Sequence, residues 1–104
     1  TQVYGSTTIG TDWTHVAVTF ENGIGQKLYV NGELDGSSSN PNAFELTGGS
    51  RGPRYIGRAD NSAFGSQPNF FNGSISELKG YSGKALTAKE VKNNYLATKS
   101  RYGL

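Results

Sequence analysis

The sequence predicts an all-β fold, an antiparallel β-sandwich with one short helix near the C-terminus. Three observations carry this prediction. Residues 14–20 alternate between apolar and other side chains, as a half-buried strand does. Two Asn-Gly pairs follow this run at short intervals, and Asn-Gly favours tight hairpin turns. The 104 residues include 15 glycines and 12% aromatic residues, a composition typical of short strands joined by many turns.

Two consecutive hairpins are predicted after the first strand. A turn at 21–25 leads into a strand at 27–30, and the second Asn-Gly pair, at 31–32, returns the chain into a strand at 33–35. The first two strands share one apolar face, which five side chains make: Val16, Val18, Phe20, Leu28 and Val30.

Shorter strands and one helix are predicted in the rest of the chain. We expect strands at 44–47 and 54–58, an irregular stretch at 59–69, and a last strand at 71–81 that glycines interrupt. A helix is expected over 88–97, where the apolar pattern changes to a helical spacing.

A capping box marks the start of this helix. Thr87 is followed three residues later by Glu90, so each side chain can accept a hydrogen bond from the other residue's backbone N–H. Val91 and Tyr95 lie four residues apart and share one helix face.

Composition excludes several classes of protein and site. The chain has no cysteine, which excludes a disulfide scaffold, a thiol nucleophile and a cysteine-ligated zinc site. Its single histidine excludes a metal site built from several histidines. The sequence lacks a run of about 20 apolar residues, so we expect no membrane partner.

Charge is divided unevenly between the two halves of the chain. Residues 1–50 hold one lysine and five acids, a balance of −4, whereas residues 51–104 hold nine basic and three acidic residues, a balance of +6. Such a run of basic residues is typical of a solvated helix face. It lacks the aromatic–basic pattern of nucleic-acid-binding motifs, so we expect no nucleic-acid partner.

Several stretches follow a known family pattern in order and spacing. Residues 13–20 read WTHVAVTF and residues 27–34 read KLYVNGEL; residues 56–58 read IGR, residues 71–78 FNGSISEL and residues 85–91 ALTAKEV. Together they resemble the central hairpin, the returning strand and the short helix of laminin G-like domains. These domains belong to the concanavalin A-like lectin/glucanase superfamily, so the resemblance implies a jelly-roll fold of the concanavalin A-like type.

The resemblance covers the second half of such a domain. It implies that residues 1–104 form a laminin G-like segment, the C-terminal part of a larger domain. A half-sandwich alone would expose its apolar face. We therefore expect other polypeptide to complete the sandwich, or a second copy to do so in a homo-oligomer. The tail, residues 93–104, is also similar to the ends of laminin G-like segments in tailed-phage virion proteins.

No catalytic site is expected. Glucanases of this superfamily carry the pattern Glu-x-Asp-x-(x)-Glu on one strand, which sets two carboxyl groups at the spacing of a retaining mechanism. Residues 33–35 (ELD) match only its first three positions, and Ser37 and Ser38 stand where the second Glu would be. His15 has no nucleophile motif beside it and is expected to pack or hydrogen-bond across the sheet.

Calcium is the one cofactor that the resemblance suggests. Many relatives bind Ca²⁺ through loop carboxylates, asparagine side chains and backbone carbonyls, and the matching candidates here are Asp60, Asn61 and Asn69. Only one of the three is a carboxylate, and Ca²⁺ takes roughly six to eight oxygen ligands. The alternative is that these residues only form turns.

A glycan is one candidate ligand, beside a surface. Sugars bind proteins through an aromatic face and a few directed polar groups. The candidates are Tyr55, Arg58 and Phe64, with Phe64 favoured as a loop aromatic because the aromatic residues of the sheet are expected in the core.

The sequence thus predicts a recognition or adhesion module without catalytic activity that binds a glycan or a surface. It would belong to an extracellular protein, either secreted or on a cell surface, or to a virion surface. The alternative is a purely structural virion or assembly domain without a ligand. A glycoside hydrolase is the least favoured interpretation, because the second Glu is missing.

Overall fold

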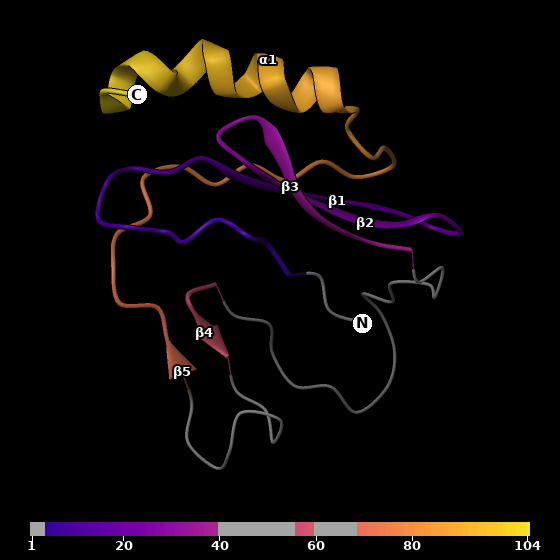
Figure 1. The fold of residues 1–104 in the computed structure, drawn as a ribbon, viewed down its shortest axis with the longest axis horizontal. Coiled ribbons are helices and arrows are strands. Elements are labelled where there is room, and N and C mark those ends of the chain that lie inside the picture. Colours follow the sequence, from indigo (N-terminus) through magenta and orange to yellow (C-terminus); the bar gives the residue numbers. More distant parts are fainter. Residues whose placement is uncertain (1–3, 40–55, 60–68) are drawn as a thin grey trace. The chain divides into compact units, whose positions relative to one another are not determined.

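The computed structural model describes residues 4–39, 56–59 and 69–104, which form two compact units (Figure 1). One unit comprises residues 1–44 and 81–104, and the other comprises residues 45–80. The elements of the first unit are β1 (Val16–Glu21), β2 (Gly25–Val30), β3 (Glu33–Ser38), α1 (Ala88–Thr98) and a 3₁₀-helix, η2 (Lys99–Tyr102). Those of the second unit are β4 (Arg58–Ala59) and β5 (Asn69–Phe70).

The three strands β1, β2 and β3 form an antiparallel sheet in chain order. The turn between β2 and β3 has φ of 49° at Asn31 and 80° at Gly32, and a type I′ turn requires positive φ at both positions. Asn31 also fastens the start of β1, because its Oδ1 accepts a hydrogen bond from the His15 N–H at 2.9 Å and its own N–H donates to the His15 carbonyl at 2.8 Å. Both predicted hairpins are therefore confirmed.

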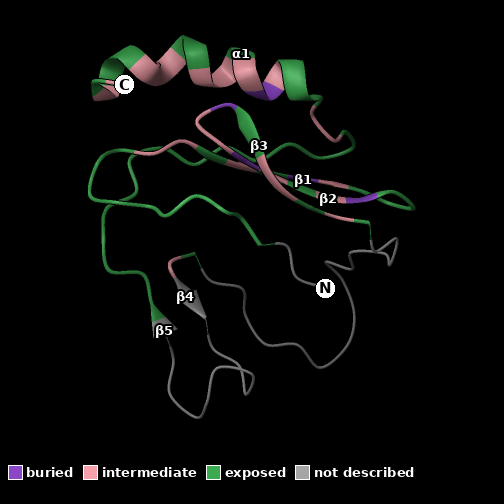
Figure 2. Ribbon diagram, in the orientation of Figure 1, coloured by how far each residue is buried: buried purple, intermediate pink, exposed green. Residues whose placement is uncertain are grey.

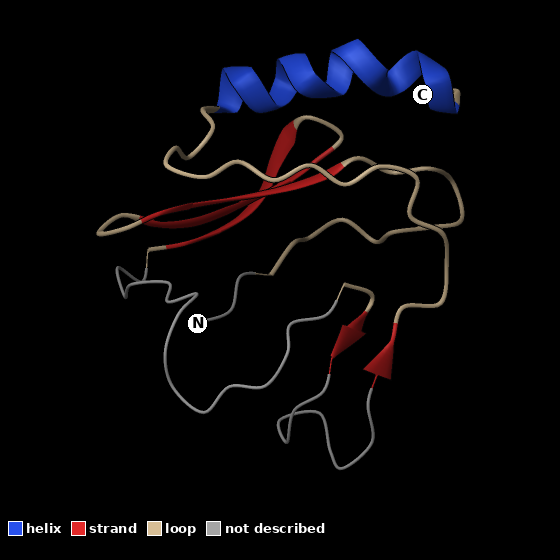
Figure 3. Ribbon diagram, turned by 180° about the vertical axis from the view of Figure 1, so that it is seen from behind, coloured by secondary structure: helices blue, strands red, loops and turns tan. Residues whose placement is uncertain are grey.

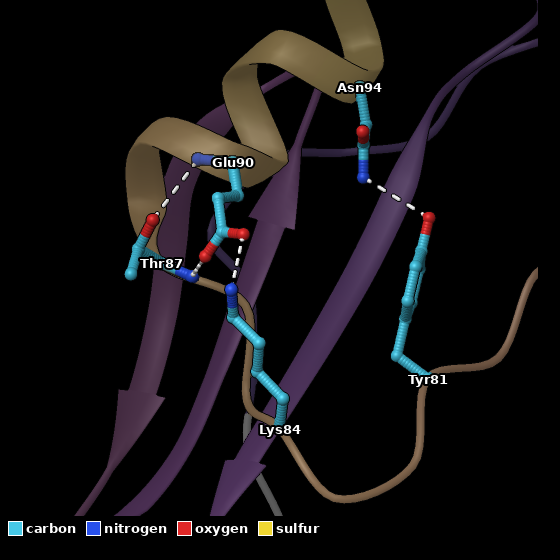
Figure 4. A network of polar contacts seen from close by, with 5 residues as sticks. All are labelled: Tyr81, Lys84, Thr87, Glu90 and Asn94. Atoms are coloured by element: carbon cyan, nitrogen blue, oxygen red, sulfur yellow. Dashed lines mark hydrogen bonds and ion pairs between the residues drawn. The ribbon is translucent and has the colours of Figure 1, made fainter.

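The capping box at the start of α1 is formed as the sequence predicts (Figure 4). The Glu90 N–H donates to Thr87 Oγ1 at 3.2 Å, and the Thr87 N–H donates to Glu90 Oε1 at 3.1 Å. Lys84 Nζ lies 2.7 Å from the other oxygen of Glu90, and its hydrogen bond, followed by those from Thr87, lowers the pKa of the Glu90 carboxyl. Further along the helix, Asn94 Nδ2 donates to Tyr81 Oη at 3.5 Å.

The helix of residues 88–98 confirms the predicted span of 88–97 to within one residue. In the part of the chain that the structure describes, no helix has both the length and the apolar character needed to cross a membrane.

Helix α1 packs on one face of the sheet (Figure 3). The His15 ring lies 5.7 Å from the Tyr95 ring of α1, and strand alternation places His15 and Ala17 on the same face. Tyr29 pairs with Ala17 and therefore shares this face. Tyr29 is 2% exposed and Val91 of α1 is 1% exposed. This helix-covered face holds the core of the first unit.

The opposite face of the sheet carries the predicted apolar side chains, and parts of these strands are exposed (Figure 2). Val18 lies opposite Leu28 and Val16 opposite Val30, so the predicted apolar face forms in the predicted register. Yet Val16 is 53% exposed and Val18 is 60% exposed. These two side chains of the predicted apolar face are thus exposed among the described residues. That the segment is half of a larger sandwich stays a prediction.

The second unit departs from the predicted strands. Residues 71–81 contain no strand, whereas a strand had been expected throughout this range. Of the strand expected at 54–58, residues 54–55 lie outside the described residues; among residues 56–58 Arg58 is in a strand, and it pairs through β4 with β5. A strand needs a hydrogen-bonded neighbour, and these short apolar runs carried no information about where that neighbour lies. The strand expected at 44–47 lies outside the described residues.

Candidate functional site

The candidate ligand residue Arg58 and the candidate metal ligand Asn69 lie on one short ribbon, β4 and β5. Arg58 pairs with Phe70 and Ala59 pairs with Asn69. The Phe71 N–H donates to the Gly57 carbonyl at 2.8 Å and extends the pairing by one step. The ribbon thus brings the backbones of the two candidates close together, although 11 positions separate them in sequence.

The remaining predicted site residues lie outside the described residues: Tyr55, Asp60, Asn61 and Phe64. In sequence, the last three belong to the segment that connects β4 to β5. Among the described residues, no group of three or more His, Cys, Asp or Glu side chains is placed to hold a metal ion. The calcium site stays a prediction.

Two exposed phenylalanines mark the ribbon. Phe70 is 68% exposed and Phe71 is 59% exposed, and Ile56, two residues before β4, is also exposed. The Phe71 ring lies against Gly73, where an added Cβ would be 2.9 Å from the ring atom Cε1. Glycine therefore leaves room for the ring close to the backbone at this point.

Phe71 is not among the ligand-binding candidates that the sequence suggests, because the sequence predicts this residue in a long strand. The signal that could have found it is the adjacent pair of aromatic residues. Neighbouring side chains on a strand point to opposite faces of the sheet. Two adjacent aromatic residues at the end of a strand can therefore present an aromatic ring on each of its two faces.

The two carboxylates of the partial glucanase pattern are each engaged in a contact between distant segments. Glu33 forms an ion pair with Lys92 of α1. Asp35 accepts hydrogen bonds from Ser6 Oγ at 3.3 Å, from the Thr7 N–H at 3.0 Å, and from Thr7 Oγ1. These contacts favour structural roles for both carboxylates.

The bonds from Thr7, followed by the weaker ones from Ser6, lower the pKa of Asp35 below its ordinary value of 3.8. Desolvation acts in the opposite direction and is outweighed. Asp35 is therefore held as an anion that accepts hydrogen bonds. The register of the sheet changes here, because Leu28 pairs with Gly36 and Tyr29 with Leu34, so that Asp35 is left as the extra residue of a bulge.

The contact between Asp35 and Thr7 is expected to depend on pH in the acid range. A carboxyl whose pKa is lower in the folded state contributes stability above its unfolded-state pKa, and the contribution is lost as pH falls through the lowered value. The Thr7 amide resonance should therefore move, and its hydrogen exchange should accelerate, on acidification below about pH 4. The Asp35→Asn variant should show neither response. An NMR titration with no midpoint below 3.8 at Thr7 would contradict the assignment.

Aromatic contacts join α1 and η2 to residues 13–15 and to each other. Trp13 lies 5.3 Å from Tyr102 between ring centroids, and Lys99 Nζ lies 5.9 Å from the centroid of Tyr95. The Tyr95 ring also meets His15. His15 thus packs against an aromatic ring, and its backbone forms two hydrogen bonds with Asn31, as expected for a structural histidine.

Comparisons with known proteins point to one family. The family model described as the concanavalin A-like lectin/glucanases superfamily matches residues 2–92 of the chain. No match was found among curated proteins.

A solved structure is similar to most of the chain. It is the crystal structure of residues 221–444 of an S-layer domain-containing protein from Clostridium thermocellum, with 31% sequence identity and a TM-score of 0.67. The similarity covers 88% of the present chain and 42% of that chain. The present chain therefore spans less than half the length of its solved relative.

Proposed function

The chain belongs to the concanavalin A-like lectin/glucanases superfamily, and from this premise we propose that it is a recognition or adhesion module without catalytic activity, whose ligand is a glycan. The membership confirms the laminin G-like resemblance and the concanavalin A-like, all-β fold class that the sequence predicts. The function itself is the proposal.

The observation that carries the proposal is the exposed aromatic surface of the β4–β5 ribbon. Phe70 and Phe71 both expose more than half of their surface. An aromatic side chain in a unit this small would ordinarily be covered, because burying one is worth about 1.5–3 kcal/mol. Pyranose rings present C–H faces that pack on aromatic rings, and polar groups beside the ring fix their orientation. Arg58, on the adjacent strand, would supply such a group.

The proposed location is extracellular and on a cell surface. The solved relative is a piece of an S-layer domain-containing protein, and a chain with this likeness fits the same setting. A virion surface, which the tail suggested, has no further support.

The absence of catalysis is supported by the carboxylates. In a retaining glycosidase two carboxyl groups flank the substrate about 5–5.5 Å apart, and one of them carries a proton. Here Glu33 bonds Lys92, and Asp35 is kept ionised by Thr7. This argues against the Glu33–Asp35 pair as glycosidase machinery.

A glycan array probed with the purified chain tests the function. We expect binding to at least one glycan class, and the array is run with Ca²⁺ and with a chelator so that loss under the chelator reports a calcium-dependent site. Phe70→Ala should weaken binding about tenfold or more, a loss of one aromatic stacking contact worth about 1.4 kcal/mol. Ile75→Ala, which alters another apolar residue of the same unit that is more than half exposed, should leave the affinity unchanged.

Other outcomes decide between the alternatives. A folded chain that binds no glycan would favour the purely structural domain. Release of reducing sugar from soluble β-glucans would establish a glycoside hydrolase. Equal binding by Phe70→Ala and the unaltered chain would remove the ribbon from the site.

A further inference from the structure

The two hairpins of the β1–β2–β3 sheet carry the same dipeptide, Asn-Gly, in their turns. Asn22-Gly23 lies between β1 and β2, and Asn31-Gly32 lies between β2 and β3. Asparagine is a thermally labile residue, and it is most labile before glycine, where no side chain hinders an attack by the backbone. Because the reacting groups of the two pairs are the same, a difference between their reaction rates in the folded chain reports on the fold around each pair.

The reaction is an attack of the glycine backbone nitrogen on the side-chain carbonyl carbon of the preceding asparagine. A nitrogen–carbon bond forms, the bond from this carbon to the side-chain amide nitrogen breaks, and the released nitrogen leaves as ammonia with the proton of the backbone N–H. Water then opens the cyclic imide at either of its carbonyl carbons and yields aspartate or isoaspartate. The nitrogen reaches the carbon only if the peptide group between the two residues is free to turn.

The turn at Asn22-Gly23 leaves this peptide group free. Both residues are exposed, and a hydrogen bond from the Ile24 N–H to the Glu21 carbonyl, at 3.0 Å, closes the turn around them. Gly23 has φ of 85°, and an added Cβ there would meet nothing within 4 Å. In the part of the chain that the structure describes, no hydrogen bond holds the Asn22 side chain. Glycine adopts both signs of φ, so the peptide group before Gly23 can rotate.

The turn at Asn31-Gly32 is held on both sides of the same peptide group. The Asn31 side chain accepts a hydrogen bond from the His15 N–H at 2.9 Å, and the Asn31 N–H donates to the His15 carbonyl at 2.8 Å. Gly32 is buried, and an added Cβ there would lie 3.0 Å from side-chain atoms of both Lys92 and Tyr95 in α1. The reaction at Asn31 therefore requires a local opening that breaks these hydrogen bonds and moves α1 away from Gly32.

We propose that Asn22 is a site of spontaneous modification, at which the chain acquires aspartate or isoaspartate, and that His15 and helix α1 protect Asn31 from the same reaction. Aspartate in the first turn adds a negative charge next to Glu21, and isoaspartate also lengthens the backbone of the turn. The tip of the first hairpin thus changes in charge and shape as the protein ages, whereas the second hairpin, which contacts α1, does not. The proposal does not depend on the glycan function.

Peptide mapping by mass spectrometry tests the proposal, because trypsin separates the two sites. Cleavage after Lys27 and Arg51 places Asn22 in the peptide of residues 1–27 and Asn31 in the peptide of residues 28–51. The chain is incubated at mildly alkaline pH, folded in buffer and unfolded in urea, and far-UV circular dichroism follows α1 in both samples. Fragment spectra at successive times give the rate at which each of the two asparagines becomes aspartate or isoaspartate.

In urea, Asn22 and Asn31 should react at similar rates. In the folded chain, Asn22 should keep most of this rate, whereas Asn31 should react at least about 100-fold more slowly, since each tenfold loss corresponds to about 1.4 kcal/mol of local opening. Equal rates in the folded chain, or a faster reaction at Asn31, would overturn the proposal. So would an Asn22 that reacts in urea and is unreactive in the folded chain.

Two lysine variants of α1 test whether the helix protects Asn31. Lys92→Ala removes one of the side chains that lie on Gly32, so the reaction at Asn31 should accelerate about threefold or more and that at Asn22 should not change. Lys89→Ala is the matched control, because it removes an exposed lysine of the same helix and should change neither rate. If Asn31 reacted no faster in K92A than in K89A, the assignment of α1 as its protection would be wrong.

Discussion

Replacing Tyr29 with alanine is expected to lower the free energy of unfolding by about 3–5 kcal/mol. Tyr29 lies in the central strand of the sheet and is 2% exposed, on the face that α1 covers. Truncation removes a large ring from the middle of a small core and leaves a cavity between strand and helix. Because the total stability of a domain is only about 5–15 kcal/mol, this one change should remove much of it.

Two control variants separate the loss of the ring from other effects. Tyr29→Phe keeps the ring and should cost much less, about 1 kcal/mol, since only the hydroxyl is lost. Tyr81→Ala removes an aromatic side chain that is 55% exposed and should change stability by about 0.5 kcal/mol or less. Urea denaturation followed by far-UV circular dichroism measures all three. A Tyr29→Ala loss no larger than that of Tyr81→Ala would show that the helix-covered face is not the core.

The local elements of the fold could be predicted from the sequence because their signals are short-range. Asn31-Gly32 supplies the two positive φ angles of its turn by itself. Thr87 and Glu90 lie within one helical turn and complete each other's hydrogen bonds. The alternation of β1 also set its register with β2, because a slip of one residue would have moved every apolar side chain to the wrong face.

Long-range contacts could not be predicted in this way. The partner of Glu33 is Lys92, 59 positions away, and the partner of Asp35 is Thr7, 28 positions away. The spacing of residues 33–35 alone suggested part of a carboxylate pattern. Their contacts show instead that one residue docks the helix and the other holds the N-terminal segment.

The binding roles of the candidate site residues stay predictions. Arg58 and Asn69 were chosen for their chemistry, and the pairing of β4 with β5 brings their strands together. The sequence does not predict the exposure of Phe71, because apolar residues in the glycine-interrupted run of residues 71–81 look like those of a buried strand. Whether such a residue is buried depends on the neighbour that its segment finds, and the sequence of the segment does not specify this neighbour.

Gly25→Ala is the second substitution with a large expected effect. It should lower the free energy of unfolding by about 3 kcal/mol or more. Gly25 begins β2 with φ of 133°, a conformation that L side chains rarely adopt and that costs about 1–3 kcal/mol. An added Cβ would also lie 2.0 Å from the carbonyl oxygen of Ser38. This contact is with backbone, so a side-chain rotation cannot relieve it, and the end of β3 has to move away from β2.

Gly23→Ala is the matched control, because it separates the strain of φ from the steric clash. Gly23 lies in the same turn with φ of 85°, and an added Cβ there would meet nothing within 4 Å. Its expected cost is therefore the backbone strain alone, about 1–2 kcal/mol. Urea denaturation gives the free energy of unfolding of each variant. The difference between the two values measures how tightly the start of β2 packs against the end of β3. If Gly25→Ala cost no more than Gly23→Ala, β3 would be free to shift at Ser38, and the close pairing of the second hairpin would not extend to its end.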